Sequence, residues 1–234
     1  IQKTEKKLPG IARNLGSQFL EIRERQENWP VVAAIWAEQF VHHPSLHTFT
    51  ECKKACDKIN SWPTVRQHLL SYLEKGHPPW RNEKWPLPES GLGQPEPPPT
   101  SHFPKDADLL EIAIFEKNPD QVLYWYDQSA KRGFERHKVD LDTIAETICA
   151  HAPDRAVEIW QKKAENLIAL VKPKAYAHAA VYLRKARKTL CQINRQADWE
   201  QYLQDLKNTH FRKRRLMEIL QGFEHKPILK KQDS

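Results

Sequence analysis

The chain has 234 residues, of which 39% are apolar and only seven are glycine. A β-rich fold of this length would need more glycines in its turns, so the composition favours helices. No apolar run approaches the roughly 18 residues of a transmembrane helix, and no signal peptide opens the sequence. We therefore expect a cytoplasmic protein, or a nuclear one in a eukaryote, without a membrane partner.

Three further features of the sequence bear on the class of protein. Four cysteines are too few for a disulfide framework. The chain starts at Ile1 and its single methionine is Met217, so we expect a piece of a longer protein. The net charge is +7, and residues 160–234 carry 17 Lys or Arg against 7 Asp or Glu. This asymmetry indicates either an anionic partner or a solubilising end-cap.

Two short motifs recur at the period of a tetratricopeptide repeat. Trp29-Pro30 returns 33 residues later as Trp62-Pro63, and Pro119-Asp120 returns 34 residues later as Pro153-Asp154. Each motif opens a stretch with helical apolar spacing, and two short helices per period are typical of stacked α-hairpins. We therefore predict an all-α, tetratricopeptide-like α-hairpin superhelix (an α-solenoid) with an irregular proline-rich insertion.

Apolar periodicity, prolines and cap residues predict where the helices lie. Gly76 and Gly133 are suited to end the helices that precede them. We expect residues 1–9 to be frayed and residues 226–234 to be a disordered tail. In chain order, the predicted helices cover 11–26, 30–41, 46–59, 63–75, 105–115, 119–132, 141–148, 153–167, 173–193, 198–206 and 210–223.

Residues 77–104 interrupt the helical pattern. They hold nine of the seventeen prolines, which excludes a helix or a central strand. The segment is either a disordered insertion, an ordered strap held by its aromatic residues, or a docking segment. The predicted organisation is therefore N-terminal helical repeats over 1–76, a proline-rich linker or strap over 77–104, and C-terminal helical repeats over 105–225.

Residue types that could carry catalysis or bind metal do not form a recognisable set. His47, Cys52 and Cys56 are near one another, but both thiols lie on the apolar stripe of a predicted helix, which favours core cysteines over a zinc site. Cys149 and Cys191 are isolated on apolar faces. The sequence contains no phosphate-binding loop and no HExxH motif. We therefore predict no enzyme activity, no catalytic residue, no metal ligand and no cofactor.

Two basic clusters near the C-terminus are the stronger functional signal. Two antiparallel helices could bring them together into a ridge that contacts phosphates, and the alternative is the solvated face of a capping helix. The aromatic run Tyr124-Trp125-Tyr126 offers a contact for a peptide, although core packing explains it equally simply. The predicted contacts for nucleic acid or another anionic partner are Arg184, Arg187, Lys188, Arg212, Lys213, Arg214 and Arg215.

Three stretches together resemble the helical-repeat region that follows the zinc finger in SWIM zinc-finger proteins. They are residues 36–49 continued by 61–66, residues 110–117 running into Pro119-Asp120, and residues 179–187 followed by 199–206 and 210–216. The family's C-x-C and C-x-H zinc signature is absent here, so the resemblance implies a finger upstream of Ile1 and transfers no metal ligands. It implies a non-catalytic scaffold for protein–protein interaction, with nucleic-acid binding as the alternative.

Overall fold

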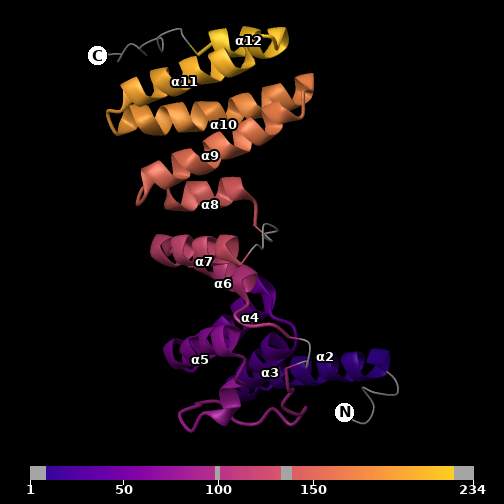
Figure 1. Ribbon diagram of the computed structural model, residues 1–234. Helices are drawn as coiled ribbons and strands as arrows, with labels where there is room; N and C mark the ends of the chain where they lie inside the picture. The colour runs from indigo at the N-terminus through magenta and orange to yellow at the C-terminus, as the bar shows by residue number, and fades with distance from the viewer. Residues whose placement is uncertain (1–8, 98–100, 133–138, 224–234) are drawn as a thin grey trace, which may run out of the picture. The chain divides into compact units, whose positions relative to one another are not determined.

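A computed structural model describes residues 9–97, 101–132 and 139–223, with side chains from residue 16 onward. Within these ranges all regular structure is helical: eleven α-helices and one short 3-10 helix, without a strand (Figure 1). The predicted all-α fold class is confirmed. The predicted helix stop at Gly133 and the predicted disordered tail lie outside the described residues.

The chain forms two compact units. Unit 1 holds the described parts of Ile1–Phe115 and Trp125–Lys138, and unit 2 holds those of Glu116–Tyr124 and Val139–Ser234. The boundary between them falls inside one helix, α7 (Pro119–Lys131).

Unit 1 is a series of short helices around an aromatic core. Phe49 lies at the centre of this core, with ring centroids 5.8 Å from Phe40 and 5.0 Å from Trp62. Tyr72 is also buried and donates its hydroxyl to the carbonyl of Val41 at 2.8 Å. The helices of unit 1 are α2 (Pro9–Arg25), α3 (Trp29–His42), α4 (Leu46–Asp57), α5 (Trp62–Lys75), the 3-10 helix η1 (Pro79–Arg81), α6 (Asp106–Phe115) and the last part of α7.

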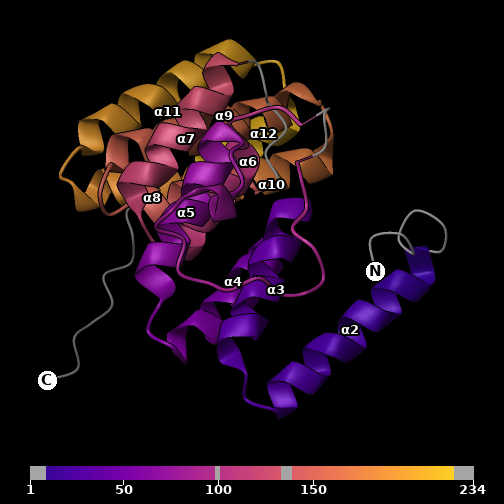
Figure 2. The same cartoon turned by 90° about the horizontal axis from the view of Figure 1, so that it is seen from below.

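The proline-rich segment lies against the helices of unit 1. The buried Ser90 hydroxyl donates to the Glu38 carboxylate of α3, and the Trp85 ring lies 5.7 Å from His68 of α5. Figure 2 shows the segment crossing α3, with α2 to one side. At its far end Phe103 packs on Tyr72 at 5.5 Å. The described residues of this segment therefore pack on α3 and α5, and we refer to the segment as the strap.

Unit 2 is built from helices that pack mainly on their neighbours in the chain. The most extensive contact joins α9 and α10, α8 packs on α9, and α11 and α12 both pack on α10. Unit 2 also includes the first residues of α7. Its remaining helices are α8 (Leu141–Ile148), α9 (Pro153–Ala169), α10 (Pro173–Gln192), α11 (Gln196–His210) and α12 (Arg214–Gln221).

A charged network joins α8, α9 and α10. Asp142 accepts hydrogen bonds from the indole nitrogen of Trp160 at 2.8 Å and from the ammonium of Lys185 at 2.7 Å. Lys185 also reaches Glu146 at 2.7 Å. The Asp142 and Lys185 side chains are only 22% and 28% exposed, so partial burial strengthens this pairing relative to a surface ion pair.

One backbone turn recurs before five of the helices. Every described non-glycine residue with positive φ lies two positions before the first residue of a helix. A left-handed residue at this position redirects the chain, and the following N-cap residue opens the next helix. These residues are Glu27, Asn60, Lys117, Val171 and Asn194, with φ between 53° and 59°.

The last two helices differ from the sequence-based expectation. Helix α11 extends to His210, well past the predicted end at residue 206. Helix α12 begins only at Arg214, so the prediction that the whole basic run lies on the last helix is wrong. Arg212 and Lys213 lie in the α11–α12 turn. No glycine or proline marks that turn in the sequence, and α11 continues past residue 206 with Lys207 also buried.

Candidate functional site

The first predicted basic cluster lies on α10. Arg184 and Lys188 are exposed, and Arg187 is half-buried. Arg187 and Lys188 follow Arg184 by three and four residues, which puts both next to Arg184 on the helix surface. The side chain of their neighbour Lys185 belongs to the network with Asp142.

The second predicted basic cluster surrounds the α11–α12 turn. Lys213 donates to the carbonyl of Ile168, at the end of α9, with a distance of 3.2 Å. Arg215 pairs with Glu218 at 2.7 Å, and Arg214 approaches the same carboxylate at 3.6 Å. The side chains of both arginines remain largely exposed, at 94% for Arg214 and 70% for Arg215.

The bond between Lys213 and Ile168 fixes where the second cluster lies. It brings the α11–α12 turn next to the α9–α10 turn, where α10 begins. Arg184 is 12 residues beyond Lys172, so it lies about 18 Å further along α10. The seven predicted contacts thus divide between the beginning and the second half of α10.

The three residues of the predicted aromatic peptide contact differ in exposure. Tyr124 is 51% exposed, Trp125 is 5% exposed, and Tyr126 is intermediate. Consecutive helical residues point in different directions, which is why one ring faces solvent and the next is buried. Tyr124 is therefore the residue of this run that a partner can reach most directly.

An exposed apolar group, which the sequence did not predict, lies at the same end of unit 2 as the second basic cluster. Leu170, Val171 and Phe211 are 56%, 62% and 65% exposed, the highest values among the large apolar side chains described. Leu170 and Val171 form the α9–α10 turn, and Phe211 opens the α11–α12 turn. The sequence signal was the apolar pair directly before Lys172-Pro173, but adjacency to Phe211 is a tertiary feature.

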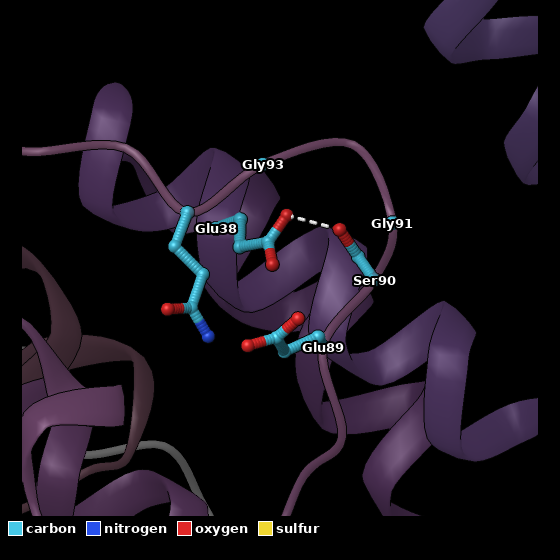
Figure 3. A pocket seen from close by; sticks show the side chains of 6 residues that line it. Glu38, Glu89, Ser90, Gly91 and Gly93 are labelled. Atoms are coloured by element: carbon cyan, nitrogen blue, oxygen red, sulfur yellow. Dashed lines mark hydrogen bonds between the residues drawn. The ribbon is translucent and has the colours of Figure 1, made fainter.

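A small cleft lies in unit 1 between α3 and the strap. It has a volume of about 240 Å³ and is lined by Glu38, Glu89, Ser90, Gly91, Gly93 and Gln94. Burial raises the pKa of Glu38, and the hydrogen bond from Ser90 opposes that shift. Figure 3 shows this hydrogen bond, with the Glu89 carboxylate facing the same space. The cleft lies along the line where the strap packs on α3.

The remaining candidate residues of the sequence are engaged in packing. Cys52 and Cys56 are fully buried with their sulfur atoms 3.9 Å apart, and the hydrogen bond with Cys56 together with burial raises the pKa of Cys52. The His47 ring lies 5.6 Å from Trp36. Cys149 contacts the hydroxyl of Thr189 at 3.4 Å. Within the described ranges, no three His, Cys, Asp or Glu side chains are grouped closely enough to hold a metal ion.

No protein-family model, no curated protein and no solved structure matches this chain. Among the residues that the structure describes, no helix has both the length and the apolar character needed to cross a bilayer. Functional conclusions for this chain therefore rest on its own surfaces and their chemistry.

Proposed function

We propose that the chain is a tetratricopeptide-like helical-repeat scaffold that works by binding other proteins. The recurring turn carries this proposal: five helices begin after the same left-handed residue, two positions before their first residue. A repeated turn between short helices is how α-hairpin arrays are built, and such arrays bind partners along their open faces.

The packing order within unit 2 supports the same proposal. Helices that pack mainly on their neighbours in the chain leave long side faces open, unlike helices folded around a central core. The resemblance to the helical region of SWIM zinc-finger proteins adds further support, because most residues of its stretches are helical and lie in α3, α4, α5, α6, α7, α10, α11 and α12. We propose that the chain serves as the scaffold part of a larger protein of that type.

Site-specific photo-crosslinking in cells tests this proposal. A photoreactive phenylalanine analogue replaces Tyr124, Val181 or Lys188, which are all exposed in unit 2. We expect one protein to be crosslinked from at least two of these positions and to bind the purified chain directly with micromolar affinity or better. The buried Trp160 is the negative control position. The proposal fails if no crosslinked protein binds the purified chain.

A second candidate is nucleic-acid binding through the two basic clusters. Exposed Arg184 and Lys188 favour it, because neither forms an ion pair with any described residue. Fluorescence anisotropy with labelled single-stranded DNA, duplex DNA and RNA provides the test at low and physiological salt. If nucleic-acid binding is the function, binding should persist at physiological salt. It should also weaken for all nucleic-acid sequences when Arg184 and Lys188 are changed to Glu. Binding confined to low salt argues against it.

A further inference from the structure

Two turns of unit 2 meet at one end and expose apolar side chains together. The bond of 3.2 Å from Lys213 to the Ile168 carbonyl links the α11–α12 turn to the α9–α10 turn. Leu170 and Val171 project from one turn and Phe211 from the other, each more than half exposed. We refer to these three residues and the basic residues around them as the turn surface.

The charge around these side chains is predominantly positive. Residues 166–178 and 206–217 contain no Asp or Glu. Glu165 of α9 lies within electrostatic reach of His210, and Glu218 pairs with both Arg214 and Arg215. These two carboxylates face six basic side chains, which leaves an excess of positive charge. The basic residues of the turn surface are Lys172, Lys174, Arg212, Lys213, Arg214 and Arg215.

Two arrangements in the turn surface are unfavourable for folding alone. Val171 has φ 53°, a left-handed conformation that is strained for a β-branched residue. Asn60 and Asn194 hold the same position in two other turns, and asparagine adopts this conformation far more readily. Arg214 and Arg215 stand in the first turn of α12, where the helix dipole disfavours positive charge. Strain and misplaced charge that persist in a fold point to a use at the surface.

We propose that the turn surface docks on an anionic lipid bilayer. Leu170, Val171 and Phe211 enter the boundary between headgroups and acyl chains, as the apolar side chains of interfacial segments do. The surrounding Lys and Arg side chains contact the lipid phosphates, and their long apolar stems allow the charged ends to stay at the headgroup level. This function goes beyond the proposed scaffold and would bring it to a membrane surface.

The composition of the turn surface favours a bilayer over other anionic partners. Nucleic acid would use the cations and the Phe211 ring, but it offers no contact that requires Leu170 or a strained Val171. A protein partner would need its own recess to receive side chains from two separate turns. A fluid bilayer accepts projecting apolar side chains without a preformed recess, and its anionic lipids match the excess of positive charge.

Vesicle flotation with the full chain tests the proposal. At physiological salt we expect binding to vesicles in which about one lipid in three is phosphatidylserine, and little binding to phosphatidylcholine alone. Changing both Leu170 and Val171 to Asn is expected to weaken binding by about tenfold or more, because apolar area no longer leaves water. Changing Arg214 and Arg215 to Glu is expected to weaken it by a similar factor. Val181→Asn, at an exposed valine elsewhere on α10, is the matched control and should bind like the parent chain.

A single variant separates docking from folding. Val171→Asn should raise the thermal midpoint by about 1 to 4 °C because it relieves the left-handed valine, while it weakens vesicle binding. If Val171 had a purely structural role, the variant would lower both the thermal midpoint and vesicle binding, or neither. The proposal is overturned if the chain does not bind phosphatidylserine vesicles, or if the Leu170 and Val171 variant binds as well as the parent. It is also overturned if duplex DNA or an acidic peptide binds through these residues and vesicles do not.

Discussion

The α9–α10 turn of unit 2 has the same backbone as two turns of unit 1 but carries different side chains. In unit 1 the left-handed positions are polar, Glu27 and Asn60, and each is followed two residues later by a tryptophan that packs back on the unit. Trp62, for example, lies 5.0 Å from Phe49. In the α9–α10 turn of unit 2 the left-handed residue is the exposed Val171, and a proline follows where unit 1 has tryptophan.

The left-handed backbone alone does not decide whether the side chains next to a turn pack on their unit or face solvent. In unit 1 a partly buried tryptophan stands at the first helical position after each turn, and Trp62 adds to the aromatic core. Unit 2 joins its helices through the network of Asp142, Trp160 and Lys185 and leaves the apolar side chains of its turn outside. Both units bury an apolar core, and unit 2 adds the charged network across α8, α9 and α10.

The largest loss of stability is expected when a ring is removed from the aromatic core of unit 1. Phe49→Ala removes a fully buried ring between Phe40 and Trp62 and should lower the free energy of unfolding by about 3–5 kcal/mol. Urea unfolding followed by circular dichroism measures the loss. Phe115→Ala, at a ring 43% exposed, is the control and should cost less than about 1 kcal/mol. Equal losses would mean that Phe49 is not central to the core.

The charged network of unit 2 should give the next largest effect. Asp142→Asn keeps an oxygen for the Trp160 indole but removes the charge that Lys185 faces, with an expected loss of about 2–3 kcal/mol. Urea unfolding at low and high salt measures it, together with Trp160 fluorescence. Asp57→Asn breaks the exposed pair with Lys53 and should change stability by less than about 1 kcal/mol. A silent Asp142→Asn variant would contradict the role given to charge in unit 2.

The junction between α5 and the strap offers a matched pair of glycines. Gly76 and Gly91 have φ of 79° and 84°, so alanine is strained at both. A Cβ at Gly76 would also stand 2.8 Å from the Phe103 ring, whereas the space at Gly91 is open. Gly76→Ala should therefore cost about 2 kcal/mol and Gly91→Ala about 1 kcal/mol, as thermal unfolding can compare. If the two variants lose the same stability, Phe103 does not hold the strap against α5.

The smallest expected effects on stability depend on pH. The stabilising contribution of Glu38 in unit 1 and that of Asp140 in unit 2 change with pH in opposite directions. Burial raises the pKa of Glu38, so its stabilising contribution is present below its unfolded pKa and is lost as pH rises through the folded value. Lys163 lowers the pKa of Asp140, whose contribution is present above its unfolded pKa and lost as pH falls through the folded value.

Thermal midpoints between pH 7 and pH 3 measure this difference. Glu38→Gln should be more stable than the parent chain at pH 7, with the gain disappearing toward about pH 4. Asp140→Asn should be slightly less stable at pH 7, with the loss disappearing below about pH 4. The comparison is refuted if both variants shift stability in the same direction at pH 7.

Local signals explain how far the sequence predicts this fold. Pro30, Pro63 and Pro173 predicted helix starts within one residue, because proline fixes the backbone at the first turn. Burial of Cys52 and Cys56 followed from their place on the apolar stripe. Such features depend on residues close in the chain.

Features that depend on distant residues stayed out of reach. The bond between Ser90 and Glu38 joins residues 52 positions apart, and that between Lys213 and Ile168 joins residues 45 apart. Neither pairing leaves a pattern in a single sequence. The turn surface was missed for this reason: its two halves lie in separate turns, and the strain at Val171 exists only in the folded backbone.

Hydroxyl-radical footprinting most directly tests the claim that unit 2 exposes apolar side chains at its α9–α10 and α11–α12 turns, whereas the tryptophans next to the turns of unit 1 are partly buried. With rates normalised to the free amino acids, the account predicts that Leu170 and Phe211 react fast and Trp62 reacts slowly in the chain alone. Phosphatidylserine vesicles should then protect Leu170 and Phe211 while leaving the exposed Ile22 and Val181 unchanged. Protection of Phe211 in the chain alone, or equal protection of all four side chains by vesicles, would contradict the account.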